Sequence, residues 1–232
     1  MKIIIELLIT ALGFWSCSNT EACVEGSGVL VMSDIEVDDI TEVVNSTDLD
    51  VRFILDDWDS IDSILIDEDL RSLFTFEVLE EALTISRPVS DCIKNYEGAS
   101  VTLMENSFAP VASIVNTGSG MIEVCPYGQN MSLTNSGSGN FYVNFGCVIP
   151  HIGPLKYQKL SVDNSGSGSI TTEFNGFFAT YSTILNSGSG DVHVNADTLD
   201  VTISGSGNVF YKGNPKIIGE TITGTGELID NN

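Results

Sequence analysis

Carboxylates are the residues best placed to do chemistry in this sequence, because 32 of its 232 residues are Asp or Glu and the formal net charge is -23. Their densest run spans Asp56 to Asp62, and Asp57, Asp59 and Asp62 offer the oxygen ligands that calcium prefers. The run departs from the EF-hand pattern, since it has no turn glycine and Ile61 occupies a ligand position. A solvated acidic surface is the alternative. The sequence therefore predicts no cofactor, and a calcium site only as a weak candidate.

The remaining acids do not form a recognisable catalytic set. A glycosidase needs two carboxylates about 5–10 Å apart, whereas the acids of the C-terminal half are isolated from one another. We find no nucleophile elbow, phosphate loop or Cys-x-x-Cys pair, and His151 and His193 lie far apart. We expect a protein that is not an enzyme, with a polysaccharide-active enzyme as the less favoured alternative.

The charge balance restricts the partners. Nucleic-acid binding needs clustered Lys and Arg, and the chain has only 9 basic residues. An anionic membrane surface is excluded for the same reason. Neutral sugars, cations or basic protein surfaces are compatible partners. The alternative is that the acidity only keeps a β-rich chain soluble.

The N-terminus has the pattern of an export signal. Lys2 precedes an apolar run from Ile3 to Leu12, which is too short to cross a membrane as a helix. Cys17 follows this run at the position of a lipidated cysteine. We predict a lipoprotein signal at 1–16, lipidation of Cys17, a tether at 17–25, and an outer-membrane or cell-surface location, with the periplasm as the alternative. A membrane contact is expected only through this anchor.

Four further cysteines belong to the exported chain, where an oxidising compartment permits disulfides. Three pairings are possible, and the sequence does not choose among them. These residues are Cys23, Cys92, Cys125 and Cys147.

A glycine tripeptide repeats through the C-terminal half. Gly-Ser-Gly occurs once early, at Gly26, and from Gly118 onward the starts are 17 to 29 residues apart, with a final Gly-Thr-Gly at Gly224. Repeats of about 20 residues are typical of solenoids, whose units cannot bury an apolar face alone. The glycines supply either a positive φ or a close backbone approach. The other starts are Gly118, Gly137, Gly166, Gly188 and Gly205.

Short strands flank each of these turns. The second residue after each turn is apolar and the fourth usually is, which is the alternation of a strand with one buried face. Tyr142 and Phe210 occupy outward offsets, where they could stack on sugar rings; cross-strand packing is the alternative. Asn residues stand two positions before most turns, which predicts a ladder of stacked amides; Asn as an ordinary turn residue is the alternative. They are Asn116, Asn135, Asn164 and Asn186.

An insertion lengthens the repeat between Gly137 and Gly166. The segment from Cys147 to Tyr157 contains two prolines, so we predict a loop that leaves the solenoid. It carries Tyr157, which we name as a weak ligand-binding candidate because loops on rigid scaffolds often carry function. Neutral length variation is the alternative.

The first half is acidic and also alternates like short strands. We predict an acidic β-rich part at 26–110, followed by the repeat solenoid at 111–230. These features together resemble the head GIN-domain family of auto-transporter adhesins. The resemblance rests on the lipobox-like start, the early Gly26-Ser27-Gly28 and the closing series from Val201 to Lys216.

That resemblance covers about 24–230. It implies an all-β, right-handed parallel β-helix-like solenoid and a role in adhesion, with carbohydrate or a surface protein as the partner. It supplies no catalytic residues. An envelope scaffold with a protein partner is the alternative function, and a homo-oligomer is possible because open sheet edges invite pairing.

Overall fold

The computed structural model describes residues 23–35, 37, 40–54, 62–87, 93–94, 98–104, 108–124, 129–143, 156–172 and 178–232. Cys17, Asp57, Asp59, the signal at 1–16 and most of the predicted loop lie outside these residues. Apart from one 3-10 turn, η1 (Arg71–Leu73), the elements of the described residues are strands. No helix among them is long and apolar enough to span a membrane.

The first half contributes β1 (Val24–Glu25), β2 (Leu30–Asp34), β3 (Ile40–Asn45), β4 (Asp50–Ile54), β5 (Ser63–Asp67), β6 (Thr75–Leu79), β7 (Ala82–Ser86), β8 (Ile93–Lys94) and β9 (Ser100–Met104). The second half contributes β10 (Phe108–Asn116), β11 (Ile122–Val124), β12 (Asn130–Asn135), β13 (Phe141–Val143), β14 (Lys156–Asn164), β15 (Ile170–Thr171), β16 (Phe178–Asn186), β17 (Val192–Ile203), β18 (Val209–Lys212), β19 (Lys216–Ile222) and β20 (Leu228–Asp230).

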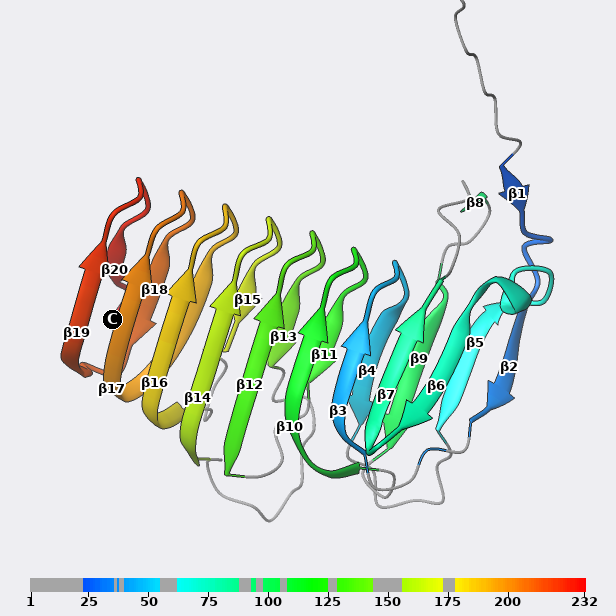
Figure 1. Cartoon of the computed structure of the whole chain (residues 1–232), viewed down its shortest axis with the longest axis horizontal. Helices are drawn as coiled ribbons and strands as arrows, with labels where there is room; N and C mark the ends of the chain where they lie inside the picture. Colours follow the sequence, from blue (N-terminus) through cyan, green and yellow to red (C-terminus); the bar gives the residue numbers. More distant parts are fainter. Residues whose placement is uncertain are drawn as a thin grey trace, which may run out of the picture.

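The repeats build two ladders of parallel strands that are joined by the glycine turns (Figure 1). The first ladder, here called ladder C, runs β3, β10, β12, β14, β16, β17 and β19. The second, ladder B, runs β4, β11, β13, β15, β17, β18 and β20. The 12-residue β17 is long enough to take part in both ladders. Each unit thus contributes one strand to each ladder.

The core lies between the two ladders because alternate residues of each strand point inward. Leu133, Val162 and Ile184 stack in register along ladder C, and each is at most 1% exposed. The same apolar cluster includes residues of the acidic first half, such as Val43 and Val51. The two predicted segments therefore share one core.

The turn glycines are required by close approach and not by an unusual φ. None of the repeat-turn glycines has a positive φ. A β-carbon at Gly137 would overlap the carbonyl oxygen of Gly118 in the preceding turn. That oxygen accepts a hydrogen bond from the Ser138 N–H at 3.1 Å, so the turns stack at hydrogen-bonding distance without room for a side chain.

The predicted right-handed parallel β-helix-like solenoid is wrong for this chain. Apart from the separate parallel pair β1–β8, the described strands form one 18-stranded mixed sheet, and its order is not that of a parallel β-helix. β3 lies between β10 and β7, and β4 lies between β11 and β9, so neither strand is beside its neighbours in sequence. Three pairs are antiparallel, namely β2–β5, β5–β9 and β6–β7.

The early Gly26-Ser27-Gly28 has a different role from the later turns. It wraps around the Asp67 carboxylate, which accepts hydrogen bonds from the Gly28 N–H at 2.6 Å, the Ser27 hydroxyl at 3.2 Å and the Asp69 N–H at 3.0 Å. Burial raises the pKa of Asp67, but these hydrogen bonds outweigh it, so the net effect lowers the pKa. Gly28 has a φ of 78°, which a side chain would strain.

Candidate binding surfaces

One outward row of ladder B contains three aromatic side chains, those of Tyr142, His193 and Phe210. Parallel register aligns successive strands so that one residue of each points outward beside the next. We call this set the aromatic row, and it lies on β4, β11, β13, β15, β17 and β18. In order along the molecule its members are Arg52, Glu123, Tyr142, Thr171, His193 and Phe210.

Both ends of the aromatic row are engaged in contacts within the protein. Arg52 Nε and Glu123 Oε2 form an ion pair at 3.2 Å. The rings of His193 and Phe210 are stacked, with centroids 4.6 Å apart and an interplanar angle of 9°. One face of the Phe210 ring is therefore covered by a neighbour, which supports the cross-strand packing interpretation for that residue.

The middle of the row differs from its ends. Thr171 is the smallest residue in the set and lies between Tyr142 and His193. Neighbouring strands are about 4.8 Å apart, so the strands that carry Tyr142 and His193 are separated by about twice that distance. Tyr142 and His193 are both partly exposed. A flat ligand ring can approach the Thr171 hydroxyl with an aromatic residue on either side.

The other predicted site residues do not join this row. Tyr157 begins the buried pattern of β14 and is 1% exposed, so its side chain is part of the core and cannot contact a ligand at the surface. Burial raises its pKa. Asp62 is 6% exposed. Within the described part of the chain, no three His, Cys, Asp or Glu residues are grouped to hold a metal ion.

Cys23 forms a disulfide. Its partner lies outside the described residues, as do the predicted candidates Cys92, Cys125 and Cys147. The pairing among the four cysteines therefore stays a prediction.

The predicted Asn residues do align, and they bond mainly to the turns. Asn116, Asn135, Asn164 and Asn186 share one register and are completely buried. The amide of Asn135 donates to the carbonyl oxygens of Gly139 at 3.0 Å and Gly168 at 3.1 Å. A direct amide–amide contact joins Asn135 to Asn164 at 3.3 Å. Each Asn thus satisfies buried turn carbonyls, which would otherwise destabilise the fold.

A second polar ladder, which sequence reasoning missed, lies where each turn leads into ladder B. There the side-chain oxygen of one residue accepts a hydrogen bond from the backbone N–H of the residue that is in register with it in the next unit. Asp191 accepts from Asn208 at 2.8 Å, and Asn208 accepts from Glu227 at 3.0 Å. Asn140 accepts from Ser169 at 2.8 Å. Asp191 is therefore a structural acid, and the recurrence of Asn, Ser or Asp directly after the turns was the available signal.

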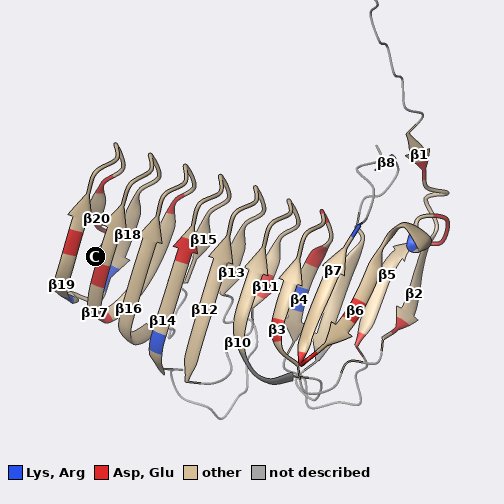
Figure 2. Ribbon diagram, viewed as in Figure 1, with Lys and Arg blue, Asp and Glu red and all other residues tan. Residues whose placement is uncertain are grey.

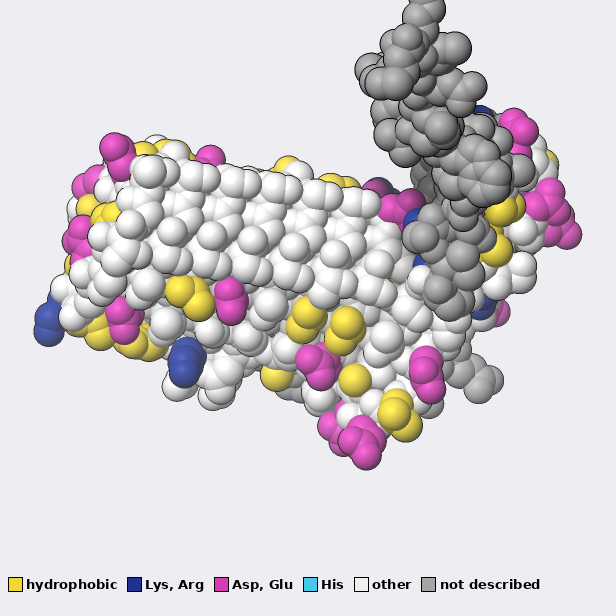
Figure 3. Space-filling view, turned by 45° about the horizontal axis from the view of Figure 1, so that its top comes forward, with side chains coloured by type: hydrophobic (Ala, Val, Ile, Leu, Met, Phe, Trp, Pro, Cys, Tyr) yellow, Lys and Arg dark blue, Asp and Glu magenta, His cyan; other side chains and the backbone are white. Residues whose placement is uncertain are grey.

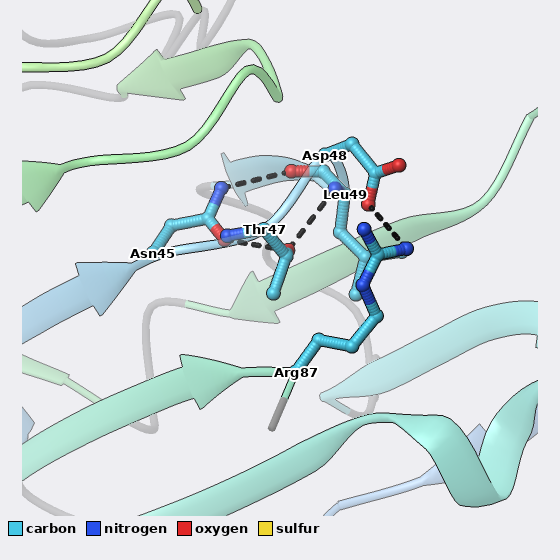
Figure 4. Close-up of polar contacts among 5 residues, drawn as sticks. All are labelled: Asn45, Thr47, Asp48, Leu49 and Arg87. Atoms are coloured by element: carbon cyan, nitrogen blue, oxygen red, sulfur yellow. Dashed lines mark hydrogen bonds and ion pairs between the residues drawn. The ribbon is translucent and has the colours of Figure 1, made fainter. Parts of the chain in front are cut away.

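A turn without glycine also belongs to the stack. Asn45 to Leu49 joins β3 to β4, and the Asn45 amide donates to the Leu49 carbonyl at 2.9 Å, as in the glycine turns (Figure 4). Thr47 fills the first glycine position, and its hydroxyl donates to the Asn45 amide oxygen at 2.8 Å. Arg87 approaches the Asp48 carboxylate at 3.7 Å beside this turn. The signal was Asn45, at the same offset as the other stacked amides.

The outer surface of the turns is flat and neutral. The Ser and Thr residues on either side of the first glycine are exposed in every glycine turn of the stack. Figure 3 shows this face as a broad area without hydrophobic or charged side chains. It offers hydroxyl groups but no aromatic ring, so a ring-stacking ligand is better served by the aromatic row.

Comparisons with known proteins agree with this architecture. The family model described as "putative auto-transporter adhesin, head GIN domain" matches residues 39–215. A crystal structure of a putative adhesin from Bacteroides fragilis has a TM-score of 0.68 at 20% identity, over 89% of this chain and 99% of that one. The comparison with curated proteins gives no match.

Two further crystal structures come from Parabacteroides distasonis. A putative lipid binding protein has a TM-score of 0.56 over 90% of this chain, and a putative adhesin has 0.54 over 89%. Both are 20% identical to this chain, which covers 99% of each. At this identity the likeness concerns the fold alone.

Proposed function

The chain belongs to the auto-transporter adhesin family with the head GIN domain, and from that premise we propose that it is an exported binding protein whose aromatic row takes a neutral carbohydrate. The observation that carries the proposal is the register of Tyr142, Thr171 and His193 on three neighbouring strands. The family and its structural relatives are described as adhesins or binding proteins and not as enzymes.

Chemistry favours an uncharged sugar over other small ligands. The net charge of -23 repels anions, so sialylated or sulfated glycans are poor candidates. An aromatic face favours the C–H face of a sugar ring, and the Thr171 hydroxyl can donate or accept a hydrogen bond. Placing these groups on paired strands holds them rigidly, which lowers the entropy cost of binding.

A glycan array probed with the soluble chain tests the proposal. We expect saturable binding to neutral glycans, and loss of about tenfold or more in affinity for Tyr142→Ala or His193→Ala, equivalent to about 1.4 kcal/mol. Tyr181→Ala is the matched control, because Tyr181 is a partly exposed tyrosine of ladder C that lies outside the aromatic row. A blank array, or equal losses in all three variants, would exclude the aromatic row as a sugar site.

The same array includes a calcium arm. Binding is measured with calcium and then with a chelator, because Asp57, Asp59 and Asp62 are the candidate calcium ligands in the sequence. Calcium-dependent binding would support that candidate, and unchanged binding would remove calcium from the proposal.

Membrane attachment through a lipid on Cys17 is the second part of the proposal. The supporting observation is Cys17 five residues after a short apolar run that ends at Leu12, and an adhesin-type family fits display at the outer membrane or cell surface. Metabolic labelling with a palmitate analogue should mark the wild type and leave Cys17→Ala unlabelled. Equal labelling of both chains would place any lipid elsewhere.

A further inference from the structure

The described stack of strands has an open sheet edge at β19 and β20. Within the described residues β19 pairs only with β17 and β20 only with β18, so the outer sides of both strands face away from the sheet (Figure 1). No described segment covers them. An exposed edge offers a row of backbone donors and acceptors to an added strand.

Backbone groups that are bonded in earlier turns have no described partner here. The carbonyl oxygens of Ile203 and Gly205 accept hydrogen bonds from N–H groups of the last turn. The oxygens of Ile222 and Gly224 occupy the same positions in the last unit, so they point out of the edge. On ladder B the Val209 N–H donates to Glu227, which leaves the matching N–H of Leu228 directed outward. A parallel strand added to β19 and continuing along the last turn would satisfy the oxygens of Ile222 and Gly224, whereas the Leu228 N–H belongs to the separate edge of β20.

The core-facing positions of the edge combine apolar and acidic residues. Ile217 and Ile222 are in register with the buried residues Leu199 and Ile203 of β17, and they are 38% and 41% exposed. Between them Glu220 is in register with Val201, which is buried. A carboxylate therefore occupies an inward position of the last strand, flanked by two isoleucines.

The charges argue against a second copy of this chain as the occupant. An inward-pointing charge disfavours the addition of identical strands. Two copies joined through this edge would bring Glu220, Glu227 and Asp230 of each together, against Lys216 as the basic residue of the edge strand. Figure 2 shows acidic residues on β19 and β17 at this end. In Figure 3 acidic and hydrophobic side chains also gather here.

We propose that the open edge of β19 binds an extended basic strand from a partner protein, in which a Lys or Arg faces Glu220 between two aliphatic residues that cover Ile217 and Ile222. The backbone groups of the edge would supply affinity and the Glu220 pair would supply selectivity. This surface lies on ladder C and the last turn, whereas the aromatic row lies on ladder B, so the two proposals stand independently.

A labelled synthetic peptide provides the probe. The peptide Thr-Ile-Thr-Lys-Thr-Ile-Thr-Gly places Ile, Lys and Ile on one face, and a second peptide has Glu in place of Lys. Fluorescence anisotropy with the full chain carrying Cys17→Ala should show binding of the Lys peptide about tenfold tighter than of the Glu peptide. Glu220→Lys should reverse this preference. Glu227→Lys is the matched control, because it makes the same charge change on the last turn without facing the core, and it should keep the original preference.

Three results would overturn the proposal. One is binding of neither peptide, and another is equal binding of both peptides. The third is a response to Glu227→Lys as large as that to Glu220→Lys. Sedimentation tests the other occupant: a dimer of the wild-type chain that Ile222→Lys dissociates would assign the edge to a second copy and overturn the proposal.

Discussion

Replacing a single turn glycine by alanine should destabilise the whole fold. We choose Gly166, because a β-carbon there would overlap the carbonyl oxygen of Gly137 and approach the Ser136 carbonyl carbon within 2.9 Å. Non-bonded heavy atoms rest about 3.5 Å apart, so the two turns must separate. This movement weakens the bonds from Gly166 N–H to Asn135 at 3.0 Å and from Ser167 N–H to Gly137 at 3.1 Å.

The expected cost follows from these contacts. Overpacking costs about 1–3 kcal/mol and each weakened hydrogen bond about 1 kcal/mol, which gives about 3–5 kcal/mol for Gly166→Ala. For a chain of this size each kcal/mol lowers Tm by about 2–4 °C, so a fall of about 10 °C is expected. Circular dichroism during heating measures it.

Ser167→Ala is the control, since Ser167 is the exposed middle residue of the same turn. A surface change of this kind should alter stability by no more than about 0.5 kcal/mol. If Gly166→Ala and Ser167→Ala have the same Tm, close approach between turns is not the reason for glycine, and the stacking argument fails.

Other predictions concern the buried polar groups. The pKa of Asp67 is lowered in the folded state, so the carboxylate's contribution to stability is present above its unfolded pKa near 3.8 and is lost as pH falls through the folded pKa. The Tm difference between wild type and Asp67→Asn should therefore be largest at neutral pH and shrink in acid. A difference that stays constant with pH would contradict this role of Asp67. Asn135→Leu removes the donor to two turn carbonyls and should lower the free energy of unfolding by about 2–4 kcal/mol in urea titration, whereas an unchanged midpoint would show that the amide is dispensable. Asp191→Ala should cost about 1–2 kcal/mol by loss of one charged hydrogen bond, and Asp163→Ala, on the outward side of ladder C, should cost less; the reverse order would contradict a structural role for Asp191.

Much of the local structure is predictable from the sequence, because repetition makes it visible. The glycine turns, the apolar residue two positions after each, and the buried Asn two positions before most of them all follow from counting offsets. The reason for glycine is not visible in that way. A positive φ and a close approach demand the same residue, and only the stacking of Gly137 over Gly118 distinguishes them.

One residue that was assigned to the predicted loop belongs to a strand. Tyr157 was grouped with the proline-containing insertion, yet it lies in β14 and is buried like Leu160 and Val162. It stands an odd number of residues before both, so the alternation that predicts their burial does not predict the burial of Tyr157. The carbohydrate candidates Tyr142 and Phe210 stay predictions as ligand residues, although they do share one outward row. His193, which stacks on Phe210, is also the third residue after its turn, so the same offset was available in the sequence but was not used.

The order of the strands could not be predicted from the sequence, although the identity of one residue reflects it. In every glycine turn of the stack a β-carbon at the first glycine position would point at the turn before it, so only a turn with no such neighbour can carry a side chain there. Thr47 occupies that position in the turn from Asn45 to Leu49, and Gly118 stacks on it. The missing glycine therefore marks this turn as the first of the stack, although β4 to β10 separate it from Gly118 in the chain. Gly224 follows the same rule, because a β-carbon there would overlap the carbonyl oxygen of Gly205, which places the last turn at the opposite end of the stack from Thr47.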